Sequence, residues 1–198
     1  MKRFSFPFPE KEIPENGIYV LFEKDEKAHD VDRIVRVGTH TGKNQLRSRL
    51  KQHFLDENKD RSIFRKNIGR AMLNKNKDFF LREWEIDLTT KKAKENFSKI
   101  IDVEKQKQIE KEVTEYIQNN FSFVVLTIQN KEKRLELESK IISTISLCKD
   151  CKPSKNWEGL FSPKEKIRKF GLWQINELNK ELITNKEIEE LKNLAKIK

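Results

Sequence analysis

Two short runs of apolar and β-branched residues constrain the fold of this chain more than any other feature. The first run is Ile18–Phe22 and the second is Ile34–Val37. Residues of these types favour strands, and two such runs on either side of a polar stretch predict a β-hairpin over residues 17–38. The connection from Glu23 to Asp32 is long and charged, which favours a loop over a tight turn.

The chain has 198 residues and a formal net charge of +10, and 35% of its residues are hydrophobic, including 13 Phe and 3 Trp. This length suits one domain, and the aromatic residues can supply a core. A basic surface fits a polyanion such as nucleic acid, although charge alone is weak support for that. The sequence has neither a membrane-spanning apolar stretch nor the apolar segment of a signal peptide, so we expect a cytoplasmic protein.

Other periodic segments indicate how the rest of the chain is organised. Leu46–Phe54 is expected to be a short helix, Phe121–Ile128 a central strand, and the segment from about Lys131 to Leu147 a helix. We therefore expect an α/β (α+β) fold, with a small mixed or antiparallel sheet flanked by helices. Outside a core of residues 17–54 and 121–160, the expected parts are a loosely packed arm (residues 1–16), an α-rich insertion (about 55–120) and a helical C-terminal extension (161–198).

Arg49 and His53 are four residues apart and lie on one side of the predicted helix, at the edge of its apolar stripe. A guanidinium in that position can bind two phosphate oxygens, and an imidazole can exchange a proton near neutral pH. Most pairs with this spacing, however, are ordinary solvated residues.

Glu138 falls within the apolar arc of the predicted helix around it, whereas Glu136 falls on the polar face. A buried carboxylate is costly unless it is paired or binds a metal. Periodicity alone leaves two alternatives open for Glu138, a metal ligand or an ion pair with Arg134 on the same arc.

Tyr19 lies in the first strand run, where alternation opposes it to its neighbours, so that its hydroxyl can reach a cleft. Action as a base would need nearby positive charge, which Arg36, Lys43 or Arg49 can supply. A strand tyrosine with one hydrogen bond is the commoner case. Asn156 lies in a predicted turn, where its side chain can hold the loop by a local hydrogen bond.

Cys148 and Cys151 form a C-x-x-C motif. A zinc site needs two further ligands, and the three histidines, His29, His40 and His53, lie at least 95 residues away in sequence. We therefore expect neither a zinc site nor, in a reducing compartment, a structural disulfide.

The order of these signals resembles the GIY-YIG nuclease family. Gly17-Ile18-Tyr19 matches its first motif, and Arg36-Val37-Gly38 stands in the place of the second. Arg49 matches the phosphate-contacting arginine of the family, and His53 the histidine one turn later. Glu138 resembles the metal-binding glutamate, and Asn156 the asparagine after that helix.

The resemblance implies an endonuclease that uses Mg²⁺ (or Mn²⁺) and acts on DNA, most simply the duplex, in restriction, phage defence or repair. Glu138 would hold the metal ion, and Tyr19, Arg49, His53 and Arg36 would be catalytic. Substrate contacts are expected from Lys43, Asn156, His40, Arg65 and Arg70, the last two as part of a basic helix in the insertion. No membrane partner is expected, and a monomer and a homodimer both stay open.

One departure bears on activity, because Arg36 replaces the tyrosine that normally opens the second motif. Arginine can still contact phosphate or act on Tyr19, but the replacement also fits altered or lost catalysis. Two alternatives to a DNA endonuclease therefore stay open: a nucleic-acid-binding module without turnover, and a nuclease that acts on RNA or single-stranded DNA.

Overall fold

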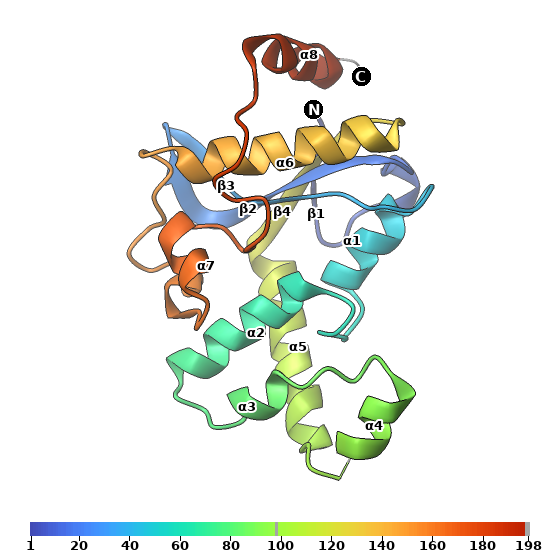
Figure 1. Cartoon of the computed structure of the whole chain (residues 1–198), viewed down its shortest axis with the longest axis vertical. Coiled ribbons are helices and arrows are strands. Elements are labelled where there is room, and N and C mark those ends of the chain that lie inside the picture. Colours follow the sequence, from blue (N-terminus) through green and yellow to red (C-terminus); the bar gives the residue numbers. More distant parts are fainter. Residues whose placement is uncertain (98, 197–198) are drawn as a thin grey trace.

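The computed structural model describes residues 1–97 and 99–196. At its centre lies an antiparallel sheet with the strand order β1-β4-β2-β3 (Figure 1). The strands are β1 (Arg3–Ser5), β2 (Gly17–Ala28), β3 (Val31–Gly38) and β4 (Phe121–Thr127). The sheet and the helices around it confirm the predicted α+β class, and the inner position of β4 confirms that it is a central strand.

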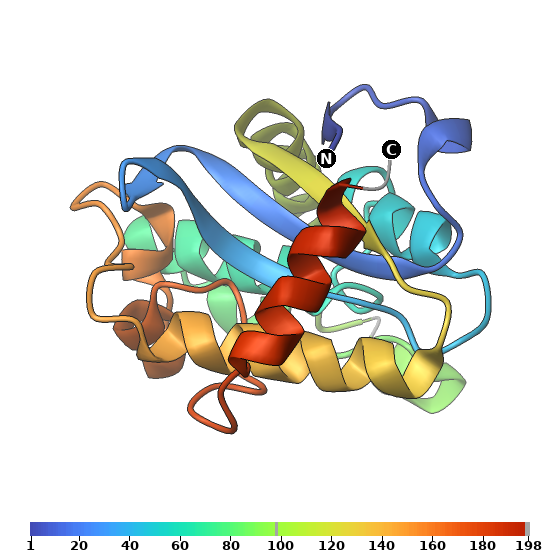
Figure 2. The same cartoon turned by 90° about the horizontal axis from the view of Figure 1, so that it is seen from above.

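Helices cover both faces of the sheet. In Figures 1 and 2, α6 lies along one face and α8 crosses on the same side, while α1, α2 and α5 lie on the other. The helices are α1 (Leu46–Phe54), α2 (Ile63–Lys75), α3 (Leu81–Trp84), α4 (Lys91–Phe97), α5 (Val103–Asn120), α6 (Lys131–Leu147), α7 (Glu165–Phe170) and α8 (Asn185–Lys196), with 3₁₀ turns η1 (Glu10–Glu12) and η2 (Glu158–Phe161). Within residues 1–97 and 99–196, the structure contains no helix with the length and apolar character needed to span a membrane.

Alternation along β2 divides the interior into two apolar clusters. Tyr19 and Leu21 pack with α1, α2 and α5, whereas Ile18 and Val20 pack with α6. All four side chains are buried, because the sheet is covered on both sides. Tyr19 therefore faces a packed layer and not an open cleft.

The prediction of a long loop between the hairpin strands is wrong. The strands β2 and β3 continue past the expected ends and meet in a tight turn at His29 and Asp30, which have positive φ values of 52° and 61°. The charges of this segment suggested an exposed loop, but two of its carboxylates, Glu23 and Glu26, are buried. Glu26 forms a buried ion pair with Arg33 across the hairpin, which offsets the cost of burying each charge.

The expected loose N-terminal arm is likewise ordered. Strand β1 pairs with β4, and Phe4 is buried with its ring 5.3 Å from that of Phe123. The short strand adds an edge to the sheet, so the aromatic residues near the N-terminus extend the core.

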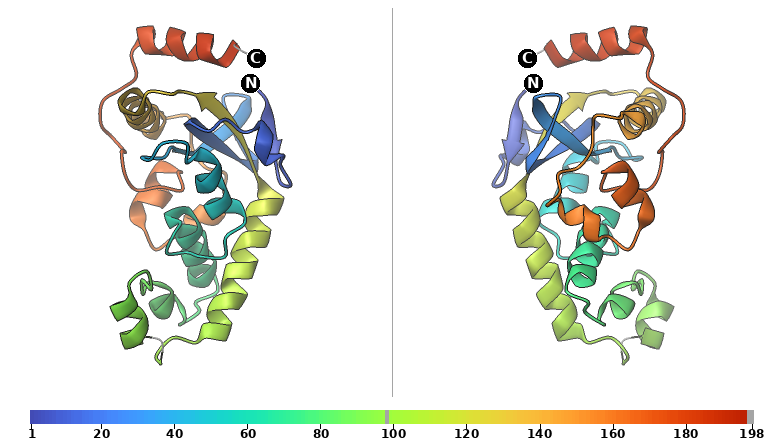
Figure 3. Two further views of the ribbon diagram at one scale, coloured as in Figure 1. Left: turned by 90° about the vertical axis from the view of Figure 1, so that its right-hand side faces the viewer. Right: turned by 90° about the vertical axis from the view of Figure 1, so that its left-hand side faces the viewer.

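The segment 55–120 extends the core away from the sheet. Figure 3 shows α5 extending away from the sheet from its junction with the start of β4, with α3 and α4 near its far end. Phe64, Trp84 and Val113 nevertheless belong to the same apolar cluster as Tyr19. The α-rich insertion expected at about 55–120 contains α2, α3, α4 and α5.

The segment after α6 is held to the sheet by Glu23. This buried carboxylate accepts hydrogen bonds from the indoles of Trp157 and Trp173 at 2.7 and 2.8 Å, and another from the hydroxyl of Tyr116. Helix α7 then ends at Gly171, whose φ of 67° favours glycine. The chain next runs along the free edge of β3, where the backbone N–H of Trp173 donates to the carbonyl of Val35.

Candidate active site

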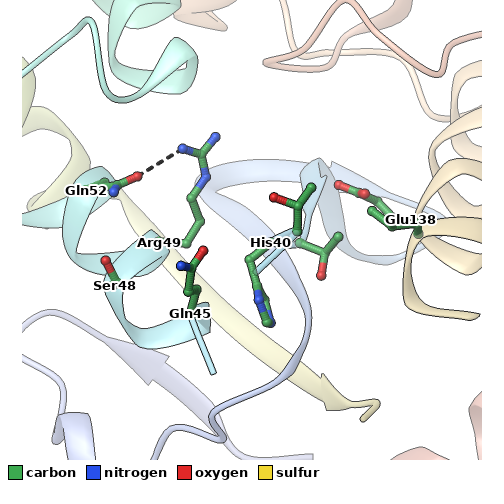
Figure 4. Close-up of a pocket in the computed structure, with 9 residues that line it drawn as sticks. His40, Gln45, Ser48, Arg49, Gln52 and Glu138 are labelled. Carbon is green, nitrogen blue, oxygen red and sulfur yellow. Dashed lines mark hydrogen bonds between the residues drawn. The ribbon is translucent and has the colours of Figure 1, made fainter. Parts of the chain in front are cut away.

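Two adjoining cavities lie beyond the β3 edge, where α1 approaches from one face of the sheet and α6 from the other. Their volumes are about 330 and 610 Å³, and Arg49, Leu135 and Glu138 line both. Figure 4 shows Arg49 on α1 and Glu138 on α6 at opposite sides of the smaller cavity. We call the two cavities together the cleft. The structure thus brings Arg49 and Glu138, two of the predicted site residues, to the same cleft.

Glu138 is a partly buried carboxylate that faces the cleft. Its neighbours on α6, Leu137 and Ile141, are buried against the sheet. Burial raises the pKa of Glu138 to about 7, although the charges of Arg36 and Arg49 and a hydrogen bond from the backbone N–H of Thr39 favour the carboxylate.

The alternative of an ion pair between Glu138 and Arg134 is not what the structure contains. The guanidinium of Arg134 donates to the backbone carbonyls of Ile128, Gln129 and His40. Among the described residues, the cations that act most strongly on Glu138 are instead those of Arg36 and Arg49, on the cleft walls.

Two guanidinium groups line the larger cavity beside Glu138. Nη1 of Arg49 donates to Oε1 of Gln52 and to the carbonyl of Arg61, both at 3.0 Å. Nη1 of Arg36 donates to the carbonyl of Trp173 at 2.7 Å. Each guanidinium has five N–H donors, so both keep donors for a phosphate.

A β-bulge sets the direction of Arg36. Leu21 pairs with Arg36 while the next residue of β2, Phe22, pairs with Ile34, so Val35 is an extra residue on β3. Arg36 is therefore directed to the same side of the sheet as Leu21, with its guanidinium 5.3 Å from the ring centre of Phe64. Its buried Nε has no hydrogen-bond partner among residues 1–97 and 99–196.

Tyr19, His53 and Ser62 form a buried chain of hydrogen bonds behind the cleft. The Tyr19 hydroxyl lies 2.7 Å from Nε2 of His53, and Nδ1 of His53 lies 2.7 Å from Oγ of Ser62. Burial, reinforced by Arg36 and the two other nearby arginines, lowers the pKa of His53 well below its usual range. A neutral imidazole has one N–H, so His53 donates to one hydroxyl and accepts from the other.

Gly38 explains why the second motif ends in glycine. It pairs with Tyr19 across the hairpin, and a Cβ at this position would lie 2.2 Å from the Tyr19 hydroxyl oxygen. Any larger residue would displace the tyrosine from His53. Neither Tyr19 nor His53 lines the cleft, so the structure places the two candidates next to each other but behind its wall.

The predicted substrate-binding residues on loops are divided between the cleft and the surface. His40 lines the smaller cavity, and its Nδ1 lies 2.7 Å from the carbonyl of Gly42. Burial lowers the pKa of His40. Lys43 and Asn156 are exposed loop residues that line neither cavity, and their predicted roles stay predictions.

Arg65 and Arg70 occupy positions that argue against the predicted phosphate contacts. Arg65 is fully buried and bonded to Glu110, with Nη2 2.7 Å from the carboxylate. Arg70 is also buried, and it pairs with Glu85 from the segment after α3. The basic pattern of α2 suggested an exposed surface, but these two charges serve the packing of the helices.

The C-terminal segment forms a part of the cleft that was not predicted from the sequence. Gln174, Asn176 and Glu177 line the larger cavity, and Oε1 of Gln174 accepts a hydrogen bond from the backbone N–H of Val37. Asn176, and not Asn156, is thus the asparagine of this region that the fold brings to the cleft. The placement of Asn176 in the cleft follows from the contact of this segment with the β3 edge, and no local sequence pattern predicts it.

The donors around Glu138 fit a divalent cation of the Mg²⁺ or Mn²⁺ type. Such ions take oxygen ligands and are commonly bound by one or two carboxylates with water and substrate phosphate completing the shell. Glu138 offers a carboxylate that faces a cavity, and burial makes its negative charge costly despite the nearby arginines. The second carboxylate of the cleft, Glu177, is bonded to Ser139 and Lys180 and is less available.

Comparisons with known proteins agree with this geometry. A family model described as the GIY-YIG domain matches residues 4–197. Neither the curated proteins nor the solved structures give a significant match. The family match spans nearly the whole chain and includes the hairpin, the arginine of α1 and the glutamate of α6. The chain therefore belongs to the GIY-YIG family, whose domain is that of a nuclease-type endonuclease.

Proposed function

We propose that this protein is a divalent-metal-dependent endonuclease that hydrolyses phosphodiester bonds in DNA. The observation that carries the proposal is Glu138, a partly buried carboxylate that faces two guanidinium groups in a cavity of about 610 Å³. A carboxylate beside arginines in a cavity suits a phosphate diester bridged to a metal ion. The net charge of +10 further supports a nucleic-acid substrate.

The residues of the cleft have separate roles in this proposal. Glu138 would hold the cation, which supplies Lewis-acid stabilisation of negative charge on the scissile phosphate. Arg49 and Arg36 bind the non-bridging oxygens and stabilise the charge that develops in the transition state. The hydrogen bonds from Arg49 to Gln52 and to the Arg61 carbonyl fix its guanidinium before substrate arrives.

Tyr19 and His53 act through Arg49 in this proposal, as positioning residues. Both are fully buried, and His53 lies one turn after Arg49 on α1. Their hydrogen bond ties α1 to β2 and so sets where Arg49 enters the cleft. Activation of water by Tyr19, which the family resemblance implies, requires the hydroxyl to become accessible to the cleft.

The test is cleavage of supercoiled plasmid in Mg²⁺ and in EDTA by the wild type and by Glu138→Gln. Glu136→Gln is the matched control, because Glu136 lies on the exposed side of the same helix and pairs with Lys140. We expect metal-dependent nicking or linearisation by the wild type and the control, and loss of about 10²-fold or more in Glu138→Gln. Equal cleavage by Glu138→Gln would remove Glu138 from the reaction.

Parallel assays on duplex DNA, single-stranded DNA and RNA of one sequence address the substrate. The proposal expects the duplex to be cleaved fastest. Faster cleavage of RNA or of single-stranded DNA would make that nucleic acid the substrate in place of duplex DNA. Salt-sensitive binding to the duplex without cleavage of any substrate would support the alternative of a nucleic-acid-binding module. The observation that favours this alternative is the replacement of the motif tyrosine by Arg36.

A further inference from the structure

A cluster of one histidine and two cysteines lies outside the cleft. Nε2 of His29 is 3.3 Å from Sγ of Cys148 and 3.3 Å from Sγ of Cys151. All three ligand atoms lie within 4.8 Å of one another. The sequence separation that argued against such a cluster is bridged by the fold, because the tip of the β2–β3 hairpin lies beside the end of α6 (Figure 1).

The backbone on both sides presents these ligands in a defined way. His29 occupies the first position of the hairpin turn, with a φ of 52° that histidine rarely adopts. Cys148 is the C-terminal cap of α6, and the backbone N–H groups of Asp150 and Cys151 are directed at its sulfur. Backbone N–H donors to a cysteine sulfur stabilise a thiolate, the form of cysteine that binds a metal.

We propose that His29, Cys148 and Cys151 form a site for a thiophilic divalent cation, best matched by zinc. Zinc binds thiolate at about 2.3 Å and imidazole at about 2.0–2.1 Å, so its tetrahedral ligands lie about 3.5–3.8 Å apart. The two distances of 3.3 Å from Nε2 of His29 to the sulfurs need to change by only a few tenths of an ångström to reach that spacing. Binding releases the thiol protons to solvent, and water completes the tetrahedron on the side of the exposed His29.

The position of the site indicates a structural role. It links the hairpin tip to the end of α6, and these two elements carry Arg36 and Glu138 on opposite walls of the cleft. A metal ion there would fix the distance between the walls from a point outside them. The site is therefore independent of the cation proposed at Glu138, and it stands whether or not the protein cleaves DNA.

The experiment is a titration of the reduced, metal-free full chain with Co²⁺, followed by competition with Zn²⁺. We expect one Co²⁺ per chain with the thiolate charge-transfer band and the intense visible bands of tetrahedral cobalt, and displacement by one Zn²⁺. The Cys148→Ser/Cys151→Ser variant should lose these bands, and His29→Ala should weaken Zn²⁺ binding by about 10²-fold or more. Lys149→Ala, between the cysteines, should keep the wild-type spectrum.

Glu138→Gln separates this site from the cleft, because it should leave the cobalt spectrum unchanged. Zinc should also raise the unfolding temperature of the wild type, and not that of the double cysteine variant. The proposal is overturned if cobalt binds without thiolate bands, if the double cysteine variant binds zinc as tightly as the wild type, or if the two cysteines of the protein purified under reducing conditions prove to be joined in a disulfide.

Discussion

The hydroxyl of Tyr19 on β2 lies 2.7 Å from Nε2 of His53 on α1, and both side chains are fully buried. This bond joins the first motif of the family to the helix that carries Arg49. It exists because Gly38 leaves room for the hydroxyl and because Ser62 holds the far side of the imidazole. The most recognisable residue of the motif thus lies behind the wall of the cleft, in contact with the helix that forms it.

Tyr19→Phe leaves Nε2 of His53 buried without its partner. The expected loss is about 1–3 kcal/mol of unfolding free energy, measured by urea titration. In a positioning role, kcat falls while its pH profile keeps its shape, because no titrating group of the reaction is removed.

The matched control for Tyr19→Phe is Tyr116→Phe, which removes a partly buried hydroxyl that is bonded to Glu23 and belongs to a residue outside the lining of the cleft. It should lose stability and keep kcat. If Tyr19→Phe instead abolishes the alkaline or acidic limb of the pH profile, Tyr19 takes part in proton transfer directly.

Glu138 makes stability depend on pH. Its pKa is about 7 in the folded chain against a reference of 4.5, so between these values the folded carboxyl keeps a proton that the unfolded one has released. Its contribution to stability is therefore greatest below pH 4.5 and falls as the pH rises to 7. At about 1.4 kcal/mol for each pKa unit, the loss has an upper bound of about 3 kcal/mol.

Glu138→Gln should accordingly stabilise the metal-free chain at pH 8 and change it little at pH 4.5, as measured by urea unfolding in EDTA. Glu136→Gln should show no such difference between the two pH values. Mg²⁺ should bind about tenfold more weakly for each pH unit below 7, because the cation needs the carboxylate. An Mg²⁺ affinity that does not change between pH 6 and 8 would place the cation elsewhere.

Local patterns predicted the elements whose packing is repetitive. The bounds of α1, β4 and α6 agree with the apolar periodicity to within a residue or so, because each buries one face or both faces against the sheet. The prediction for the second half of β2 was wrong because two of its acidic residues, Glu23 and Glu26, are buried against tertiary partners. Glu23 binds Trp157 and Trp173, more than 130 residues away, and no local pattern reveals such partners.

The candidate site shows the same division. Glu138 could be singled out from the sequence because helix periodicity places its charge within an apolar arc, and Arg49 because it lies at the edge of one. Gln174 and Asn176 could not, since they reach the cleft only through the contact of their segment with the β3 edge. Arg65 was predicted to lie on an exposed basic surface because the Glu110 that neutralises it lies on another helix.

Arg36→Met keeps an unbranched apolar stem and removes the charged guanidinium. The guanidinium of Arg36 lowers the pKa of Glu138, so its loss should raise that pKa further. The midpoint of the pH dependence of Mg²⁺ binding should move to higher pH, and cleavage at pH 7 should fall. Arg33→Met, which breaks a buried pair on the same strand outside the cleft, is the control and should lose stability without moving the midpoint. An unchanged midpoint in Arg36→Met would show that Arg36 does not act on Glu138.

Arg65→Met and Arg49→Met should have opposite effects, because one arginine is buried in the fold and the other faces the cleft. Arg65→Met leaves the carboxylate of Glu110 buried without its cation, and the expected loss is about 3–5 kcal/mol of unfolding free energy. The fraction that stays folded should bind duplex DNA as the wild type does. Arg49→Met removes a phosphate contact, so stability should change by less than about 1 kcal/mol while kcat falls by about 10²-fold or more. Urea unfolding, gel-shift titration and plasmid cleavage on the same preparations measure all three quantities. A loss of DNA affinity in Arg65→Met at unchanged stability would return Arg65 to the substrate-binding surface.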